Sequence, residues 1–431
     1  MRSITARCWQ GTHLSDALHL FSGEFASFRL RVVGTFAEHV SRLRRGTKVT
    51  NNGQFRGATL TVDLRAVRAN YRLLRSRLGA PTLCAGVVKA DAYGLGASYV
   101  ALALFAEGCR HFFVAHLDEG LALRPYLPRS ADIFILNGLP RGAEQECAMA
   151  GLVPVLNSLE QAETWFDCAR KLARALPTVV QVDSGMNRLG LMPDDVATCA
   201  KKYSRAGVFD LRFVMSHLAC ADTPAHEANA MQLSAFRQLA ALFPDVPRSL
   251  ANSSGIFLGR DYHFNLVRPG AALYGVNPDS AAANPMQPVV RLAARVIQLR
   301  DVSPGDRVGY GLDYSVPAAS RLATLSIGYA DGLHRLWGKS GAVFFEGKRL
   351  PVVGRVSMDS IVVDASSVAS GRIGPDSEVE VIGDCQAVDD LASAAGTIGY
   401  EVLTALGHRY RRIYLGADES VPSVVLEDSL S

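Results

Sequence analysis

The chain has 431 residues, of which 48% are hydrophobic and 20% are charged, an ordinary globular composition that suffices for two domains. The formal net charge is only +4, so no strong overall field favours nucleic acid, and no apolar run approaches the ~20 residues of a membrane span. The eight cysteines stand singly, without the spacing of a metal site, which favours a reducing compartment such as the cytoplasm. We therefore expect a cytoplasmic protein with a small-molecule substrate and with no metal, nucleic-acid or membrane partner.

The first 56 residues differ from the rest, because they carry nine Lys or Arg side chains against three Asp or Glu. A bland extension, or a coding start placed too early, explains this composition better than a targeting segment for an organelle. We therefore expect residues 1–56 to form a basic N-terminal extension outside the core fold.

A regular alternation of helix-like and strand-like segments follows. Residues 63–78 predict a helix, since Asp63 can cap its start and apolar residues recur at helical spacing. Residues 82–89 form a continuous apolar run, which is typical of a strand buried on both faces. Further strands are expected at residues 111–116, 131–138, 151–158, 178–185, 209–218 and 263–270, with helices at 97–108 and 117–127. The alternation predicts parallel strands, and the number of units favours a (β/α)8 TIM-like barrel over residues 57–290.

The pattern changes after about residue 290. Short strand-like segments are separated there by Pro, Gly and Asp turns, with little helix before residues 389–407. We predict a mainly antiparallel β domain over residues 291–415, followed by a tail of residues 416–431. The expected fold class is thus α/β, a barrel followed by a β domain.

Lys89 stands where a buried strand of the predicted barrel ends. Barrel enzymes place their chemistry at the carboxyl ends of the strands, and Arg188, His217 and Arg268 also follow such ends. A lone lysine there is more often a solvated charge than a catalyst. Lys89, however, lies between the apolar run LCAGVV and the small residues of ADAYGLG. Partial desolvation would lower the pKa of its amine and make it available as a nucleophile or a proton carrier.

The motif VVKADAYG resembles the cofactor-lysine motif of the alanine racemase family, whose members are pyridoxal 5'-phosphate enzymes built on a barrel plus a β domain. Further motifs of that family follow in the expected order after residue 57: VDSGMNRLGL, SHLACAD, ANSSG, VRPGAALYG, VGYG, IGYADG, VSMD and GYEVL. One such motif would be weak evidence, whereas the ordered set is strong. The resemblance implies an isomerase that interconverts L- and D-alanine and supplies D-alanine for peptidoglycan.

The resemblance also implies four catalytic residues. Racemisation needs a proton carrier on each face of the substrate carbon, and one base can serve only one face. Lys89 would hold the cofactor covalently and serve one face, while Tyr310 of VGYG would serve the other and enter from the partner subunit of a homodimer. His217 would lie beneath the cofactor ring and Arg268 behind it, where both would ease ionisation of the tyrosine. Because a guanidinium only donates hydrogen bonds, Arg268 would leave the ring nitrogen unprotonated and disfavour side reactions of the cofactor.

The remaining site residues are assigned by the same resemblance. The cofactor would be bound by Lys89, Tyr93, His217, Asn252, Ser253, Arg268, Gly270, Ala271 and Tyr400. The substrate would be bound by Arg188, Met358, Tyr310, Tyr329 and Asp359. Taken singly, several of these residues have simpler interpretations, since His217 could be a core histidine, Met358 a packing residue and Asn252 a helix cap. Only the assembled set favours the functional interpretation.

Two positions depart from the family pattern. Many members carry, seven residues before Arg188, a carbamylated lysine whose anion orients the arginine, whereas this chain has Gln181. The amide of Gln181 carries no charge, so a bound anion such as chloride could take that place, or its oxygen could accept a hydrogen bond from Arg188. The second departure is Leu95, where the family often has histidine. These departures keep open a racemase of broader specificity for serine or lysine. A non-catalytic carrier of pyridoxal phosphate is the alternative from another class, although it would lack the β domain and Tyr310.

Overall fold

The computed structural model describes residues 56–203 and 209–417, so nearly all of the predicted basic extension and of the C-terminal tail lies outside the described residues. Within the described ranges, no helix is both long enough and apolar enough to cross a membrane.

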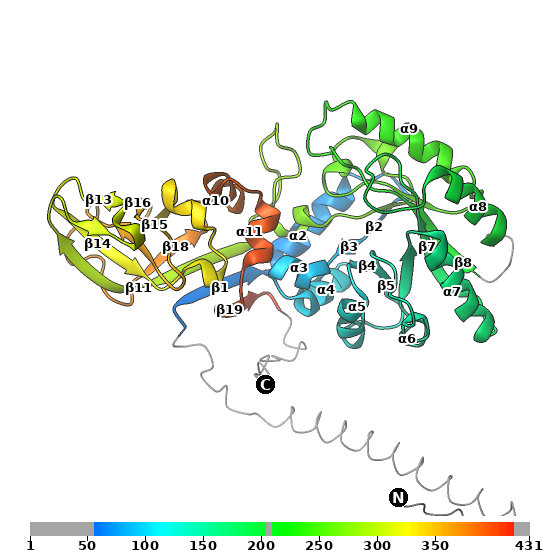
Figure 1. The fold of residues 1–431 in the computed structure, drawn as a ribbon, viewed down its shortest axis with the longest axis horizontal. Coiled ribbons are helices and arrows are strands. Elements are labelled where there is room, and N and C mark those ends of the chain that lie inside the picture. Colours follow the sequence, from blue (N-terminus) through cyan, green and yellow to red (C-terminus); the bar gives the residue numbers. More distant parts are fainter. Residues whose placement is uncertain (1–55, 204–208, 418–431) are drawn as a thin grey trace, which may run out of the picture. The chain divides into compact units, whose positions relative to one another are not determined.

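Parallel strands form the first part of the fold (Figure 1). Seven of them pair in sequence order: β3 (Gly86–Val87), β4 (His111–Val114), β5 (Asp132–Ile135), β6 (Val153–Leu156), β7 (Leu176–Gln181), β8 (Phe209–Met215) and β9 (Arg248–Ser249). A further pair, β2 (Leu83–Cys84) and β10 (Leu266–Val267), closes the ring. The closing hydrogen bonds run from the Ala85 N–H to the Val267 carbonyl and from the Arg268 N–H to the Ala251 carbonyl, both 2.9 Å long. With β2 and β3 counted as one broken strand, the described residues form the predicted eight-stranded barrel.

Helices flank the barrel strands (Figure 1). They are α2 (Leu64–Ser76), α4 (Ala97–Ala106), α5 (Leu117–Leu123), α6 (Glu144–Ala150), α7 (Leu159–Lys171), α8 (Pro193–Tyr203) and α9 (Ala228–Ala240), with short 3₁₀ turns η1 (Arg124–Tyr126), η2 (Ser254–Ile256), η3 (Arg260–Tyr262) and η4 (Ala271–Tyr274). The predicted cap of α2 is confirmed, because Asp63 Oδ1 accepts a hydrogen bond of 2.9 Å from the Arg65 N–H. Helices α2, α4 and α5 were predicted individually, whereas α6, α7, α8 and α9 were not.

The β domain is mainly antiparallel, as predicted. Its strands are β11 (Val290–Val302), β12 (Arg307–Val308), β13 (Tyr314–Ser315), β14 (Ser320–Leu325), β15 (Ala342–Phe345), β16 (Lys348–Val353), β17 (Ile361–Asp364), β18 (Glu378–Ile382) and β19 (Arg411–Leu415). The order β14-β17-β16-β15-β18-β11 is closed by pairing of β11 with β14, so a second small barrel results. Short turns η5 (Tyr310–Leu312), η6 (Tyr329–Asp331) and η7 (Arg335–Lys339) connect the strands.

Helix near the end of the domain is divided in two, α10 (Val388–Ala395) and α11 (Gly399–Ala405). Gly396 ends α10 with a φ of 71°, a left-handed conformation that glycine adopts without steric cost. The predicted helical segment 389–407 is therefore two helices rather than one.

The first strand, β1 (Ala58–Asp63), corrects the expected domain boundary. The sequence analysis placed it in the barrel, but it pairs antiparallel with β11 and parallel with β19 (Figure 1). Its residues alternate between buried and half-buried, as in a strand with one covered face, whereas a barrel strand is apolar on both faces. The alternation of apolar and polar residues in ATLTVD already indicates a strand with one covered face. Within the described residues, the chain thus passes from the β-domain sheet into the barrel through α2.

Candidate active site

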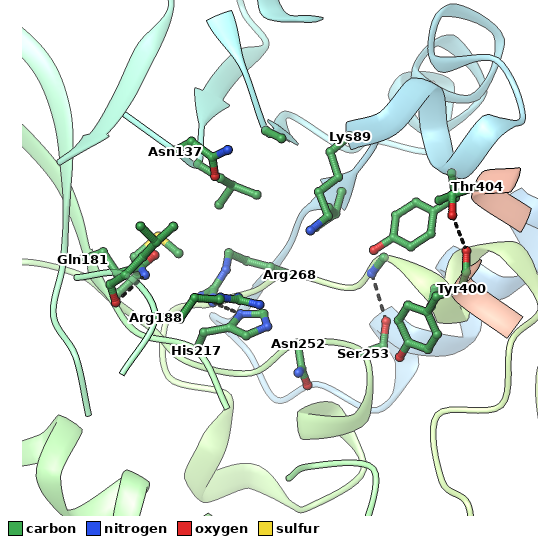
Figure 2. A pocket seen from close by; sticks show the side chains of 18 of the residues that line it. Lys89, Asn137, Gln181, Arg188, His217, Asn252, Ser253, Arg268, Tyr400 and Thr404 are labelled. Atoms are coloured by element: carbon green, nitrogen blue, oxygen red, sulfur yellow. Dashed lines mark hydrogen bonds between the residues drawn. The ribbon is translucent and has the colours of Figure 1, made fainter. Parts of the chain in front are cut away.

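A cavity of about 750 Å³ lies at the carboxyl ends of the barrel strands (Figure 2). Its walls come from the segments after β3, β4, β5, β7, β8, β9 and β10, and from α11 of the second domain. The predicted site residues that line it are Lys89, Tyr93, Arg188, His217, Asn252, Ser253, Arg268, Gly270, Ala271 and Tyr400. Residues separated by more than three hundred positions in the sequence therefore share one space.

Lys89 reaches this cavity from a left-handed turn. The preceding strand is fixed to β4 by a 2.8 Å hydrogen bond from the Val88 N–H to the Phe113 carbonyl. In the following turn, α3 (Lys89–Gly94), φ lies between 51° and 57° from Ala90 to Tyr93. Burial lowers the pKa of the Lys89 amine from its usual value, and the charge of Arg188 lowers that pKa further. The neutral amine is therefore more accessible than in an exposed lysine.

His217 and Arg268 form a pair at the base of the cavity (Figure 2). Arg268 is only 4% exposed, and its guanidinium donates to the Ser249 hydroxyl, to the Ser216 carbonyl at 2.6 Å and to His217 Nδ1 at 3.5 Å. Because a guanidinium cannot accept, Nδ1 is the acceptor and the proton of a neutral His217 ring sits on Nε2. Removal from water lowers the pKa of His217 to about 3, with Arg268 as the next cause. His217 is therefore neutral at physiological pH.

A second group of residues forms a polar cradle around Ser253. Ser253 Oγ accepts hydrogen bonds from the Gly270 N–H at 2.9 Å and from the Ala272 N–H at 3.2 Å. Its own hydroxyl proton is consequently left to donate into the cavity. The Tyr93 hydroxyl lies against Gly270, where an added Cβ would stand 2.4 Å from that oxygen. The cradle thus offers hydroxyl donors and closely approaching backbone in the same place.

The hydroxyl and backbone N–H groups of the cradle, together with the positively charged side chains of the cavity, fit a phosphate group. Hydroxyl and backbone N–H groups are the usual partners of a phosphate bound by late loops of a barrel. Among the described residues that line the cavity, the charged groups are Lys89, Arg188 and Arg268 against the single carboxylate of Glu401. An anionic molecule with a carbonyl carbon that can react with Lys89 suits these residues, and pyridoxal 5'-phosphate has both features.

Arg188 extends from a tightly closed loop between β7 and α8. Asp183 Oδ1 accepts hydrogen bonds from three backbone N–H groups of that loop, at distances from 2.8 to 3.2 Å. Gln181, at the position of the first departure, donates from its amide nitrogen to the Leu189 carbonyl at 3.1 Å. It thus holds the backbone of the loop. Within the described residues, the Arg188 guanidinium itself has no hydrogen bond or ion pair. Leu95, the second departure, is fully buried at the end of α3.

The predicted substrate residues of the β domain do not line this cavity. Tyr310, Met358 and Tyr329 are 70%, 52% and 44% exposed. The loops of Tyr329 and Met358 are joined, because the Tyr329 N–H donates to the Ser357 carbonyl at 3.0 Å. Asp359 forms an ion pair of 2.6 Å with Arg409. These residues therefore gather on loops of the second domain, outside the space that contains Lys89.

The sequence analysis missed several residues that shape the site. Tyr274 packs its ring 4.8 Å from that of Tyr93, and its hydroxyl donates to the Val87 carbonyl at 2.8 Å. Glu119 accepts a hydrogen bond from the Ala90 N–H, next to Lys89. The cavity lining also includes Asn137, Glu401 and Thr404. Two of these residues stand inside quoted motifs, Tyr274 in VRPGAALYG and Glu401 in GYEVL. Glu119 had a signal of another kind, since it occupies the third position of a helix, where a capping-box carboxylate is expected. Over the residues that the structure describes, no group of His, Cys, Asp or Glu could hold a metal ion.

Known families match both parts of the chain. Residues 62–278 match the model of the N-terminal domain of alanine racemase, and residues 289–414 match the model of its C-terminal domain. A catabolic alanine racemase of Mesorhizobium japonicum is 52% identical over 360 residues, which is 84% of this chain and 94% of that protein. An alanine racemase of Brucella canis is 48% identical over 372 residues, covering 83% and 94% of the two chains.

Solved structures agree with the sequence relatives. The alanine racemase of Bartonella henselae, described with covalently bound pyridoxal phosphate, has a TM-score of 0.80 and 43% identity over 83% of this chain and 99% of that chain. The biosynthetic alanine racemase of Pseudomonas aeruginosa has a TM-score of 0.77 and 36% identity, with coverage of 84% and 99%. Both domains and their order are thus shared, and the chain belongs to the alanine racemase family.

Proposed function

We propose that this protein is a pyridoxal 5'-phosphate-dependent isomerase that interconverts L-alanine and D-alanine. The observation that carries the proposal is the convergence, in one cavity, of a desolvated Lys89, the His217–Arg268 pair and the hydroxyl cradle around Ser253. Relatives near 50% identity over most of their length are alanine racemases, which supports the same reaction.

Each part of the cavity has a role toward the cofactor. Lys89 would bind it covalently, and Arg268 and His217 would face its ring. The phosphate would be held by Tyr93, Ser253 and Tyr400 and by the backbone N–H groups of Gly270 and Ala271, with Asn252 beside them. When bound, pyridoxal 5'-phosphate supplies the electron-accepting ring that makes the Cα–H bond of an amino acid acidic. Since Arg268 only donates hydrogen bonds, it would leave the nitrogen of a bound cofactor ring unprotonated.

Two proton carriers complete the proposed mechanism. The Lys89 amine takes or gives the proton on one face of the substrate carbon. Tyr310 of the partner subunit does so on the opposite face, because its exposed position on a loop of the β domain leaves it available to another protomer. The Arg188 guanidinium pairs with the substrate carboxylate and orients it. Met358, Tyr329 and Asp359, on neighbouring loops, would close the substrate side of the partner's cavity.

The proposal includes a homodimer and a cytoplasmic location. Within one described chain, the cavity contains Lys89 but not Tyr310, and so lacks the proposed base for the second face of the substrate carbon. A homodimer would supply Tyr310 to each cavity. Cytoplasmic supply of D-alanine for peptidoglycan is consistent with the seven cysteines of the described residues, all of which are free thiols.

A chiral assay combined with an absorbance spectrum tests the function. The purified protein should show the visible absorbance of a lysine-bound cofactor and should convert L-alanine to a racemic mixture. The variant Lys89→Ala should lose that absorbance and reduce the rate by at least about a thousandfold, since it removes both the anchor and one base. Full activity in this variant would refute the mechanism. Serine and lysine belong in the same assay, because turnover of either at the rate of alanine would support the broader racemase instead.

A further inference from the structure

The left-handed turn after Lys89 has to be held by its surroundings. Ala90, Asp91, Ala92 and Tyr93 all carry side chains, and the left-handed conformation is sterically unfavourable for residues other than glycine. Such a run persists only where neighbouring contacts fix it, and strained backbone of this kind gathers at functional sites. The contacts that fix the turn therefore also decide where the Lys89 amine lies.

Glu119 provides such a contact at the start of the turn. Its Oε1 accepts a 2.6 Å hydrogen bond from the Ala90 N–H, the first backbone donor after Lys89. Its Oε2 accepts from the Ala115 N–H at 2.6 Å and from the His116 N–H at 3.0 Å. One carboxylate thus joins the turn after β3 to the loop after β4. A helix cap alone would need only the second oxygen, so the bond to Ala90 is an additional function of this side chain.

Arg412 holds the other end of the same turn. Its guanidinium donates to the Gly94 carbonyl at 2.7 Å and to the Gly407 carbonyl at 3.0 Å. Asp91, inside the turn, accepts from the Ala97 N–H at 2.7 Å and begins α4. The turn is therefore anchored at its first N–H and at its last carbonyl by charged side chains that do not touch the cavity.

We propose that Glu119 is a positioning residue for the Lys89 amine, which it aims into the cavity by joining the Ala90 N–H to the loop after β4. This inference rests on the proposed role of Lys89 as the residue that binds the cofactor. A shorter side chain or an amide at position 119 cannot serve all three N–H groups, because an amide presents only one acceptor oxygen.

The charges around the Lys89 amine let the proposal be tested through the pH at which this amine loses its proton. The charged groups that face Lys89 are Arg188, from the loop after β7, and Glu119, from α5, while His217 stands at the end of β8. Burial and Arg188 lower the pKa of the Lys89 amine, whereas Glu119 raises it, because its negative charge favours the protonated amine. Removal of that charge should therefore leave the amine neutral at a lower pH than in the wild type.

The test measures covalent capture of pyridoxal 5'-phosphate by the apoprotein, a step in which amine and aldehyde condense with loss of one water. The rate constant of capture, its pH midpoint, kcat for alanine and the thermal midpoint are compared in the wild type, Glu119→Gln, Glu119→Asp and Asp118→Asn. Asp118 is the matched control, because it is exposed in the same first turn of α5 and carries the same charge.

We expect Glu119→Gln to lower the capture rate constant and kcat by about ten- to a hundredfold, as for a reacting group displaced by about 1 Å, and to move the pH midpoint downward. Glu119→Asp keeps the charge and is too short to span both loops, so its capture rate should fall while its pH midpoint stays. Asp118→Asn should match the wild type in every measurement.

The proposal is overturned if Glu119→Gln and Glu119→Asp lower only the thermal midpoint and keep wild-type capture and kcat, since Glu119 would then be only a helix cap. If Glu119→Gln does not fold, the capture rate of Glu119→Asp alone decides the proposal: a lowered rate supports it and a wild-type rate overturns it. Wild-type capture of the cofactor without racemisation of alanine would refute the proposed function, whereas the comparison of capture rates among the variants would still decide the role of Glu119.

Discussion

At the scale of single residues, His217 shows how the protein sets a protonation state without a catalytic carboxylate. Burial and three surrounding cations keep its ring neutral, with a pKa of about 3. An unfolded chain, whose histidine has a pKa near ~6.5, binds more protons than the folded chain between these two values. The stability that His217 contributes is therefore complete above about pH 6.5 and is progressively lost as the pH falls below it.

The protonation state of His217 can be measured in the apoprotein by nuclear magnetic resonance with labelled histidine. The ring signals of His217, assigned by their absence in His217→Asn, should stay at the neutral position from pH 8 to pH 5. Between pH 6.5 and 5, the free energy of unfolding should fall more steeply in the wild type than in His217→Asn, by at most about 2 kcal/mol. A ring that became protonated near its ordinary pKa would contradict the electrostatic role of Arg268.

At the scale of elements, the sequence predicted the barrel and the β domain because alternating apolar segments encode them directly. Ten of the residues that line the cavity were also predicted, four of them from their place after strand ends and six from the family motifs alone. The left-handed turn after Lys89 could not be predicted, because it depends on Glu119 and Arg412, which are distant in the sequence. Tyr274 was missed for the same reason: only the folded chain brings its hydroxyl to the Val87 carbonyl.

The cradle at the start of η4 gives a prediction at this scale. A Cβ at Gly270 would stand 2.4 Å from the Tyr93 hydroxyl oxygen and 3.1 Å from the adjoining ring carbon, so Gly270→Ala should displace the tyrosine. We expect the dissociation constant for pyridoxal 5'-phosphate, measured by fluorescence of the apoprotein, to rise about tenfold or more in this variant. The double variant with Tyr93→Phe lacks the hydroxyl and therefore the clash. Its loss of binding free energy for pyridoxal 5'-phosphate should be smaller than the sum of the losses in the two single variants. Strictly additive losses would show that the two residues are not coupled.

At the scale of the whole molecule, the two proposed proton carriers lie in different parts of the chain. Lys89 lies in the barrel cavity, whereas Tyr310 is 70% exposed on the β domain and outside that cavity. The expected range of the barrel wrongly included residues 58–63, because the strand that they form pairs with β11, more than two hundred residues later, and local patterns do not encode partners at such a distance. The supply of Tyr310 by a partner subunit stays a prediction.

Subunit complementation tests that assignment. If each site takes Lys89 from one protomer and Tyr310 from the other, a heterodimer of a Lys89→Ala chain and a Tyr310→Phe chain has one site with both residues intact and one with neither. Heterodimers purified through a different tag on each chain should then show about half of the wild-type activity per dimer, although each variant alone is inactive. If Lys89 and Tyr310 of the same chain acted together, every site in the heterodimer would lack one base and the activity would stay at the level of the separate variants. A heterodimer of Lys89→Ala with Lys89→Ala,Tyr310→Phe is the matched control, because neither of its sites contains Lys89 and it should remain inactive under either arrangement.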